Sequence, residues 1–167
     1  MTKTVLHVGC GGQHLDDFLE GYQEIRLDID PDAHPDIVAS LLDMGDIGHF
    51  DAIYGSHVLE HFAPHEVAKV VSEFYRVLKP KGFVIMIVPN LEYVRPTDEV
   101  VYDSPAGPIT GLDMYYGKAS MVAENPYMAH KAGFVRKTLA KAFGGFSQVV
   151  VKDLTNFNLM VVATKGE

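Results

Sequence analysis

The sequence has a single cysteine, no apolar run long enough to cross a bilayer and no secretory leader pattern. One cysteine among 167 residues excludes an intramolecular disulfide framework and favours a reducing compartment. No apolar run reaches the ~18 residues that a membrane span requires. The N-terminus also lacks the basic, apolar and small-residue regions of a signal peptide. We therefore expect a cytoplasmic protein with no membrane span.

Positive charge is also scarce, since 14 Lys and Arg stand against 22 Asp and Glu, a net charge of −8. Proteins that bind duplex nucleic acid usually have clustered basic side chains, because counterion release then favours binding. The densest basic group, Lys131 to Lys141, has helical spacing and indicates a solvated helix face. The charge balance predicts no nucleic-acid partner and is compatible with a small-molecule or glycan acceptor.

The apolar pattern predicts strands that alternate with helices in a single domain, residues 1–167. Short apolar or β-branched runs predict strands over residues 4–8, 24–28, 36–39, 51–54, 83–88, 147–151 and 159–164. Helices are predicted over residues 14–20, 64–78 and 135–143. The clearest helix, 64–78, has Pro64 in its first turn and stops at Lys79-Pro80-Lys81-Gly82. Alternating strands and helices imply a mostly parallel α/β sheet.

Two stretches depart from this regular pattern. Between Asp30 and Asp36 there are too few residues for a helical crossover of about ten or more, so either the third strand is a stub at the sheet edge or an extended loop replaces the helix. Residues 89–130 are broken by proline and glycine, and we expect an irregular insertion on the acceptor side. Within it, Tyr115 and Tyr116 are either a lid over the acceptor or packing residues.

The stretch Gly9-Cys10-Gly11-Gly12 follows the first strand directly. Glycines there let the backbone approach a ligand closely, and amides at a following helix start would face an anionic group; a plain tight turn is the alternative. Asp28 lies 19 positions beyond Gly9 and ends the second strand, where a carboxylate can bind ribose hydroxyls. Because His14 stands where a dinucleotide fingerprint has glycine, the pattern favours a different nucleoside ligand.

The chain resembles a class I, Rossmann-like, S-adenosylmethionine-dependent methyltransferase of the methyltransferase type 11 group. The resemblance rests on VLHVGCGGQ (5–13), RLDID (26–30), LLDM (41–44), FDAIYGSHVLEHF (50–62), YRVLKPKGF (75–83), IVPN (87–90), HKAGF (130–134) and GGFSQVVV (144–151). It implies a three-layer α/β/α sandwich with a mostly parallel seven-stranded sheet, an antiparallel last strand and a degenerate third strand at the edge. The implied cofactor is S-adenosylmethionine, and the implied product is S-adenosylhomocysteine.

The resemblance also implies roles for individual cofactor-binding residues. The turn from Gly9 through Cys10 to Gly11 would wrap the methionine end of the cofactor. Asp28 would hold the ribose, with Asp30 as the alternative. Ile29 would lie against the adenine.

Further along the chain, the resemblance places Asp43 at the adenine amino group with the Met44 backbone beside it. Ser56 and His57 would line the methyl-transfer pocket. Gln13 stands where the family usually has a third glycine, which puts the shape of the turn in doubt.

A general base is needed if the acceptor is a hydroxyl or a protonated amine, and histidine suits this role near neutral pH. The candidates are His57 and His130, and a reaction without a base is the alternative. His57-Val58-Leu59-Glu60-His61 also spells the H-x-x-E-H of a zinc hydrolase, in which His57, Glu60 and His61 would act on one helix. We expect a methyltransferase that binds no metal.

A non-catalytic scaffold that keeps the cofactor fold is the other rival. Because the first strand begins near Thr4, no N-terminal cap helices are expected over the acceptor. The active site would then be open, or completed by residues 89–130, by a homodimer or by a partner chain.

Overall fold

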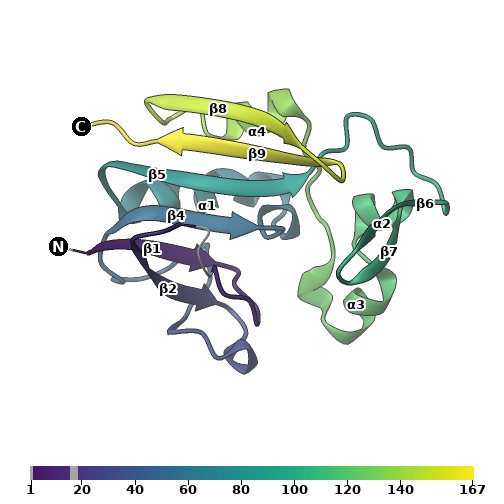
Figure 1. Cartoon of the computed structure of the whole chain (residues 1–167), viewed down its shortest axis with the longest axis horizontal. Helices are drawn as coiled ribbons and strands as arrows, with labels where there is room; N and C mark the ends of the chain where they lie inside the picture. The colour runs from purple at the N-terminus through teal and green to yellow at the C-terminus, as the bar shows by residue number, and fades with distance from the viewer. Residues whose placement is uncertain (1, 16–18) are drawn as a thin grey trace.

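The computed structural model describes residues 2–15 and 19–167. Its main sheet has the strand order β3-β2-β1-β4-β5-β9-β8 (Figure 1). The strands are β1 (Lys3–Val8), β2 (Tyr22–Asp28), β3 (Ile37–Val38), β4 (Phe50–Ser56), β5 (Leu78–Pro89), β8 (Gln148–Leu154) and β9 (Asn158–Thr164). Strand β9 is antiparallel to β5 and β8, and the other neighbours are parallel. The mostly parallel sheet, the antiparallel last strand and the short third strand at the edge are confirmed.

The longest described helix, α1 (Pro64–Val77), forms where the apolar spacing predicts it. Pro64 presets the first turn, and the Glu66 carboxylate accepts the backbone N–H of Ala63 at 2.8 Å. The helix ends at Val77 because Leu78 takes an extended conformation and begins β5. Helix α1 has 14 residues, and no described helix is both long and apolar enough to cross a bilayer.

Strand β5 begins earlier than the sequence predicts. Lys79-Pro80-Lys81-Gly82, expected to follow the helix as a stop, lies within β5. Lys81 has a φ of +62°, and the register with β4 shifts between Phe50 and Ala52. The four residues therefore form a bulge in the sheet, which a pattern search for a regular strand does not detect.

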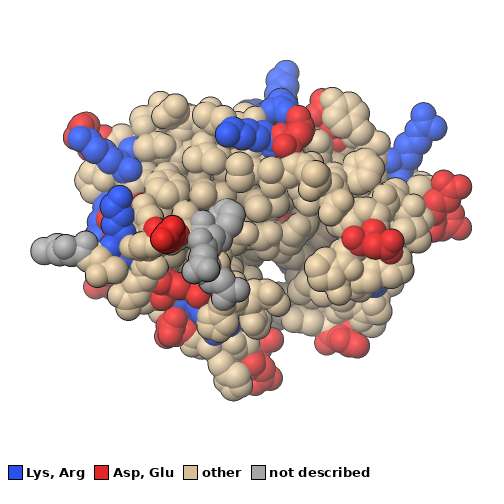
Figure 2. Space-filling model, in the orientation of Figure 1, with Lys and Arg blue, Asp and Glu red and all other residues tan. Residues whose placement is uncertain are grey.

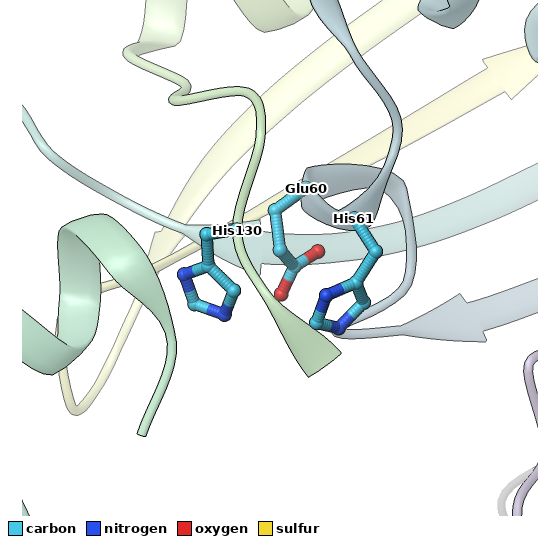
Figure 3. A group of neighbouring side chains, drawn as sticks. All are labelled: Glu60, His61 and His130. Carbon is cyan, nitrogen blue, oxygen red and sulfur yellow. The ribbon is translucent and has the colours of Figure 1, made fainter. Parts of the chain in front are cut away.

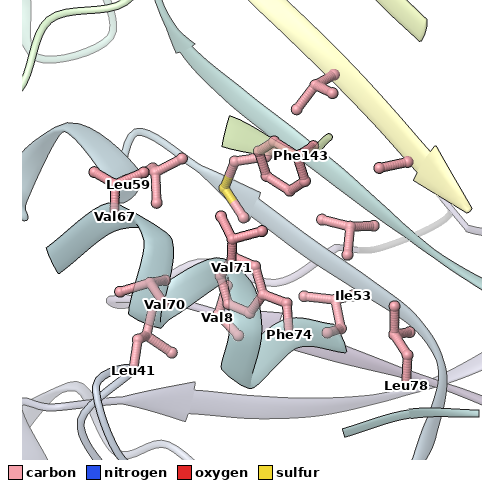
Figure 4. Close-up of a cluster of buried hydrophobic side chains, with 14 of the residues drawn as sticks. Val8, Leu41, Ile53, Leu59, Val67, Val70, Val71, Phe74, Leu78 and Phe143 are labelled. Atoms are coloured by element: carbon pink, nitrogen blue, oxygen red, sulfur yellow. The ribbon is translucent and has the colours of Figure 1, made fainter. Parts of the chain in front are cut away.

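The apolar face of α1 packs on the sheet beside α4 (Arg136–Ala142). Val70 and Phe74 of α1 are fully buried, as are Ile53 of β4 and Phe143 after α4. Figure 4 shows these side chains in one cluster. Burying each one stabilises the fold by about 1.5–3 kcal/mol, so this cluster fixes the position of the strands that carry the site.

Both α1 and α4 lie behind the sheet in the view of Figure 1. Because the β1–β2 and β4–β5 connections run in opposite directions along the sheet, right-handed crossovers place them on opposite faces. The helix predicted over residues 14–20 belongs to the β1–β2 connection. That prediction falls on residues 16–18, which are outside the described part of the chain.

The link between β2 and β3 is an extended loop around a short 3-10 turn, η1 (Pro31–Ala33). The buried Arg26 guanidinium donates to the carbonyls of Gln13 and His34, at 3.1 and 3.0 Å, and also to those of Gly11 and Ala33. A buried guanidinium needs such partners for its donors. The side chain of Arg26 thus ties this loop to the glycine turn, where other folds of this kind use a helix.

Residues 89–130 are not irregular, contrary to the prediction. After β5 they form β6 (Val100–Ser104), β7 (Gly107–Thr110), α2 (Gly111–Tyr116), α3 (Ala119–Glu124) and η3 (Pro126–Met128). Thr110 caps α2, since its hydroxyl accepts the Asp113 N–H at 3.1 Å. Each element has three to six residues, too few to show a period in the sequence. We call residues 90–134 the insertion, and it faces the carboxyl ends of β1, β4 and β5 (Figure 1). On the same face, the surface is hollowed between the insertion and the rest of the molecule (Figure 2).

Candidate active site

The predicted cofactor residues gather at the carboxyl edge of the parallel strands. Strands β1, β2 and β4 end at Val8, Asp28 and Ser56, and β1 lies between the other two. The chain leaves β1 toward β2 and later returns to the opposite side of β1 through β4. Ligands of open α/β sheets bind at such a switch point, outside the carboxyl ends.

The glycine turn after β1 depends on two left-handed residues. Gly9 has φ +60° and Gly11 has φ +48°. A Cβ on Gly9 would lie 2.5 Å from Val58 in the loop after β4, whereas no described atom lies within 4 Å of a Cβ on Gly11. Gly9 therefore packs against the β4 loop, and Gly11 leaves space for a ligand beside its backbone. The N–H and carbonyl of Gly11 are already bonded to Asp28 and Arg26. The Cys10 side chain between them is buried, and burial raises the pKa of its thiol.

The two acidic candidates after β2 lie in different hydrogen-bond networks. Asp28 accepts the Gly11 N–H at 2.7 Å and the Asp30 N–H at 3.0 Å, so its carboxylate is held at the glycine turn. Asp30 instead accepts the Asp32 N–H at 2.9 Å and caps η1. Ile29, between them, exposes 45% of its surface. An exposed apolar side chain beside a fixed carboxylate suits a nucleoside.

The loop with Asp43 and Met44 is anchored on α1. The Met44 N–H donates to Glu73 at 3.0 Å, and the Met44 side chain is buried in the core, so only its backbone can face a ligand. Glu73 also pairs with Arg76 at 2.7 Å, and this ion pair lowers the pKa of Glu73 to about 2. The Asp43 carboxylate accepts the Gly45 N–H at 3.2 Å.

A pocket of about 540 Å³ lies beside the glycine turn, on the side of η1. Its lining includes Gly11, Gly12, Asp30 and Arg26. The Arg26 donors are already taken by four backbone carbonyls. The pocket therefore offers carboxylates and backbone rather than a free cation, which disfavours a phosphate ligand there.

After β4 the chain makes a strained turn at His57, which has φ +54°. Its N–H donates to Ile87 at 2.9 Å, and its Nδ1 lies 3.2 Å from Oε1 of Glu60. Burial acts to lower the pKa of His57, but the hydrogen bond and the charge of Glu60 raise it above its usual range. Non-glycine residues in this region persist where the surrounding structure enforces them, often at functional sites.

Glu60 is a buried acidic residue beside His57 whose position sequence reasoning did not predict. It lies in the 3-10 turn η2 (Leu59–His61), and only 1% of it is exposed. Burial acts to raise its pKa, but the hydrogen bond with His57 and the charge of that imidazole lower it below its ordinary value. The sequence marks Glu60 only as part of the H-x-x-E-H pattern, and it does not predict that the side chain is buried. A segment distant in the sequence lies beside it. The N–H groups of Lys131 and Ala132 donate to the Glu60 carbonyl at 2.8 and 3.0 Å.

The same contacts bring His130 to His57, although 73 positions separate them in the sequence. Both histidines line one pocket of about 300 Å³, together with His61, Tyr102, Met114 and Lys118. His130 places its Nδ1 2.9 Å from the Met114 carbonyl, and burial lowers its pKa. The structure thus joins the two predicted base candidates at one pocket.

Two alternatives from the sequence, a tyrosine lid and a zinc hydrolase, can be compared with the structure of this region. Tyr115 donates its hydroxyl to the Val94 carbonyl at 2.8 Å, and Tyr116 is 65% exposed. The pocket is lined by Tyr102 rather than by either of these tyrosines. The H-x-x-E-H helix of a zinc hydrolase is also not formed, because His57 lies outside η2 in a left-handed conformation.

The described residues fit S-adenosylmethionine in three respects. The open backbone at Gly11 leaves room for the amino-acid end of the cofactor. The Asp28 carboxylate is fixed beside it and offers acceptors for ribose hydroxyls. The exposed Ile29 supplies an apolar surface for a base.

Comparison with known proteins agrees with this geometry. Residues 6–86 match the family model of the methyltransferase domain of type 11, which covers the sheet from β1 into β5 and ends before the insertion. No curated protein sequence matches the chain significantly.

Solved structures share the fold at low sequence identity. A protein of Pyrococcus horikoshii OT3 has a TM-score of 0.68 at 17% identity, over 99% of this chain and 82% of that one. The human N-acetylserotonin methyltransferase in complex with S-adenosylmethionine has a TM-score of 0.68 at 13% identity, over 99% of this chain and 48% of that one. The N-methyltransferase NodS of Bradyrhizobium japonicum WM9, in complex with S-adenosylhomocysteine, has a TM-score of 0.62 at 12% identity, over 99% and 79%.

At these identities the structural likeness shows the fold, and this chain spans about half the length of the human enzyme. The family model adds the enzyme class to that fold. Together with the strand order, these findings identify the chain as a class I, Rossmann-like, S-adenosylmethionine-dependent methyltransferase similar to methyltransferase type 11.

Proposed function

We propose that residues 1–167 act as one catalytic unit that methylates a small-molecule or glycan acceptor bound between His57 and the insertion. The observation that carries this proposal is the position of Ser56 and His57. They follow β4 directly, on the carboxyl edge that also carries the glycine turn, and His57 lines the pocket closed by the insertion. One edge of the sheet thus holds a nucleoside site and an acceptor pocket side by side.

Residues from three loops would each contact a different part of the cofactor. Gly9, Cys10 and Gly11 wrap the methionine end, since the turn leaves space beside Gly11. Asp28 binds the ribose hydroxyls, because its carboxylate stays at the turn while that of Asp30 caps η1. When bound, S-adenosylmethionine supplies a methyl group activated by the sulfonium charge.

The adenine end of the cofactor would lie between the other two loops. Ile29 contacts the ring, Asp43 accepts from the adenine amino group, and the Met44 backbone lies beside it. The buried Met44 side chain and the bond from its N–H to Glu73 hold this loop in place.

The acceptor pocket suits a compact polar molecule or one sugar unit. Its volume of about 300 Å³ is at the lower end of the usual range for small-ligand sites. Met114 and Ile109 give it an apolar wall, while Tyr102, Ser104 and Lys118 offer hydrogen-bonding groups. The neighbours include an N-methyltransferase and the N-acetylserotonin methyltransferase, so the fold accommodates different acceptors.

Within this pocket, His57 is placed to take the proton of the acceptor. Its Nδ1 faces Glu60, which leaves Nε2 for the acceptor. The bound cofactor would supply its methyl group to the acceptor and leave as S-adenosylhomocysteine, while Nε2 of His57 would take the acceptor proton. A positioned base of this kind contributes about 10²–10⁴-fold, and alignment of the two reactants contributes the rest.

Calorimetric titration with S-adenosylmethionine, S-adenosylhomocysteine and NAD tests the cofactor site. We expect binding of the two methionine cofactors and none of NAD. Asp28→Ala should weaken S-adenosylhomocysteine binding about 10–100-fold, the cost of losing hydrogen bonds to a charged group. The matched control Asp30→Ala should bind within about threefold of wild type. A chain that binds neither methionine cofactor contradicts the proposal.

Formation of S-adenosylhomocysteine with a panel of sugars, phenols and amines then tests the acceptor side. A chain that binds the cofactor tightly but turns over no acceptor supports the scaffold alternative. Light scattering of the purified chain decides whether a homodimer completes the open side of the pocket.

A further inference from the structure

We propose that Glu60, His61 and His130 form a binding site for a divalent transition-metal ion in the wall of the acceptor pocket. One nitrogen or oxygen atom from each residue lies within 4.8 Å of those from the other two. Figure 3 shows the Glu60 carboxylate between the two imidazole rings. The rings themselves meet edge to face at 5.2 Å between centroids. Two imidazoles and a carboxylate are a common donor set for such ions.

The Glu60 carboxylate has one oxygen without a partner. Oε1 lies 3.2 Å from Nδ1 of His57, but Oε2 is buried and has no hydrogen-bond partner among the described residues. Buried polar atoms are normally paired, and a charged one without a partner is costly. A cation at Oε2 would supply the missing partner while Oε1 keeps His57.

His130 is oriented as metal-binding histidines usually are. Its Nδ1 lies 2.9 Å from the Met114 carbonyl. A carbonyl can only accept, so Nδ1 carries the proton and Nε2 carries a free lone pair. An imidazole whose second nitrogen donates to a backbone carbonyl is the usual arrangement around a bound metal.

Both ring nitrogens of His61 face backbone carbonyl oxygens. Nδ1 lies 3.2 Å from the Ala129 carbonyl, and Nε2 lies 3.1 Å from the His57 carbonyl. A neutral imidazole has a single N–H, so one of these contacts sets a lone pair against a carbonyl oxygen. A bound metal would use that lone pair, and the other nitrogen would keep its hydrogen bond.

The donor set and the spacing narrow the choice of ion. Mg²⁺ and Ca²⁺ prefer all-oxygen sites, whereas Zn²⁺ and its neighbours accept imidazole together with carboxylate. Zinc bonds of about 2.0–2.2 Å in a tetrahedron put donor atoms about 3.3 Å apart. Metal binding would therefore draw the three side chains together, and the pocket beside them leaves room for those rotations.

Such an ion would have two consequences. Three protein ligands leave at least one coordination position open to the pocket, as in catalytic zinc sites. An acceptor with a hydroxyl, carboxylate or amine lone pair could bind there; this role rests on the proposed function. The ion would also link η2 to the end of the insertion, which carries His130, and so stabilise the insertion by binding only the closed arrangement.

Metal titration of the chain, with any affinity tag removed and metal stripped by chelator, tests the site. We expect one Zn²⁺ or Co²⁺ per chain and no comparable binding of Mg²⁺. Glu60→Gln and His130→Asn should each weaken Zn²⁺ binding by at least about tenfold, since even outer-shell changes cost about 10–100-fold. His65→Asn is the control, because His65 is exposed in the first turn of α1 and should change binding less than about twofold. Circular dichroism confirms that each variant is folded.

Two results would overturn the site. One is the absence of stoichiometric Zn²⁺ or Co²⁺ binding by the wild-type chain. The other is binding that survives both folded variants and is lost in Glu24→Gln, which would place the ion at the contacts of Glu24 with His7 and His14. Cofactor titration in the absence of metal distinguishes the two proposals. If the chain binds S-adenosylhomocysteine but no metal, the metal site is rejected and the proposed function stands.

Discussion

The loops that follow β1, β2 and β4 come from strands with buried residues in the core, whereas the insertion rests on few buried side chains. Leu6 and Val8 of β1 and Ile53 of β4 are fully buried. In the insertion, α3 and η3 contain no buried residue, and α2 contains only Gly111 and Met114. Segments with few buried apolar contacts open at low free-energy cost. The carboxyl edge of the sheet, where we propose that the cofactor binds, thus rests on a packed core, whereas the insertion has few buried contacts to hold it.

The largest difference in the free energy of unfolding is expected between substitutions of large apolar residues in the two regions. Phe74→Ala removes a fully buried ring of α1 from the core under the sheet and should lower the free energy of unfolding by about 3–5 kcal/mol. Leu112→Ala, at a residue of α2 that is 40% exposed, should change it by less than about 0.5 kcal/mol. Urea denaturation measures both, and similar losses would show that the insertion is as firmly packed as the sheet.

Within the cofactor edge, the two left-handed glycines should respond differently to alanine. Both substitutions place a Cβ in the left-handed region, at about 1–2 kcal/mol. Gly9→Ala also drives that Cβ against the stiff Val58 side chain, which adds about 1–3 kcal/mol. Gly11→Ala meets no described atom, so its main effect should be on cofactor affinity. Thermal unfolding and cofactor titration of the pair check this, and equal destabilisation would contradict the assignment of Gly9 to packing.

The smallest effect concerns pH and the loop that carries Met44. The folded-state pKa of Glu73 is about 2, below its ordinary value of 4.5. The stability it contributes is therefore complete above about pH 4.5 and is lost as the pH falls toward 2. Arg76 is 45% exposed, so solvent screens the pair and the contribution should be about 0.2–1 kcal/mol. Glu73→Gln should remove that part of the pH dependence between pH 5 and 2. An unchanged difference between the two stability curves would show that the pair contributes nothing.

The main sheet, α1 and the glycine turn could be predicted from the sequence because their patterns are local. A short stretch of sequence is enough to recognise the apolar face of α1 and the apolar run in β5. The same holds for the glycine turn, which Asp28 follows at the expected spacing. The bulge at Lys79–Gly82 was not predicted, because the strand continues through residues that normally end a helix.

The structure of the insertion and of the pocket beside it could not be predicted, because it depends on contacts between residues far apart in the sequence. The strands and helices of the insertion are too short to show a period. The backbone carbonyl of Glu60 accepts hydrogen bonds from Lys131 and Ala132. The loop before β3 is held by Arg26, which donates to four carbonyls. Residues far apart in the sequence make each of these contacts, so no spacing rule reveals them.

Hydrogen exchange with and without S-adenosylhomocysteine tests the central claim most directly. The claim is that the cofactor occupies the carboxyl edge of the sheet, while the insertion serves the acceptor. We predict slower exchange at residues 9–12, 28–30 and 43–45 when S-adenosylhomocysteine is bound, with little change over α3. Protection confined to the insertion, or no protection at the glycine turn, would contradict the account.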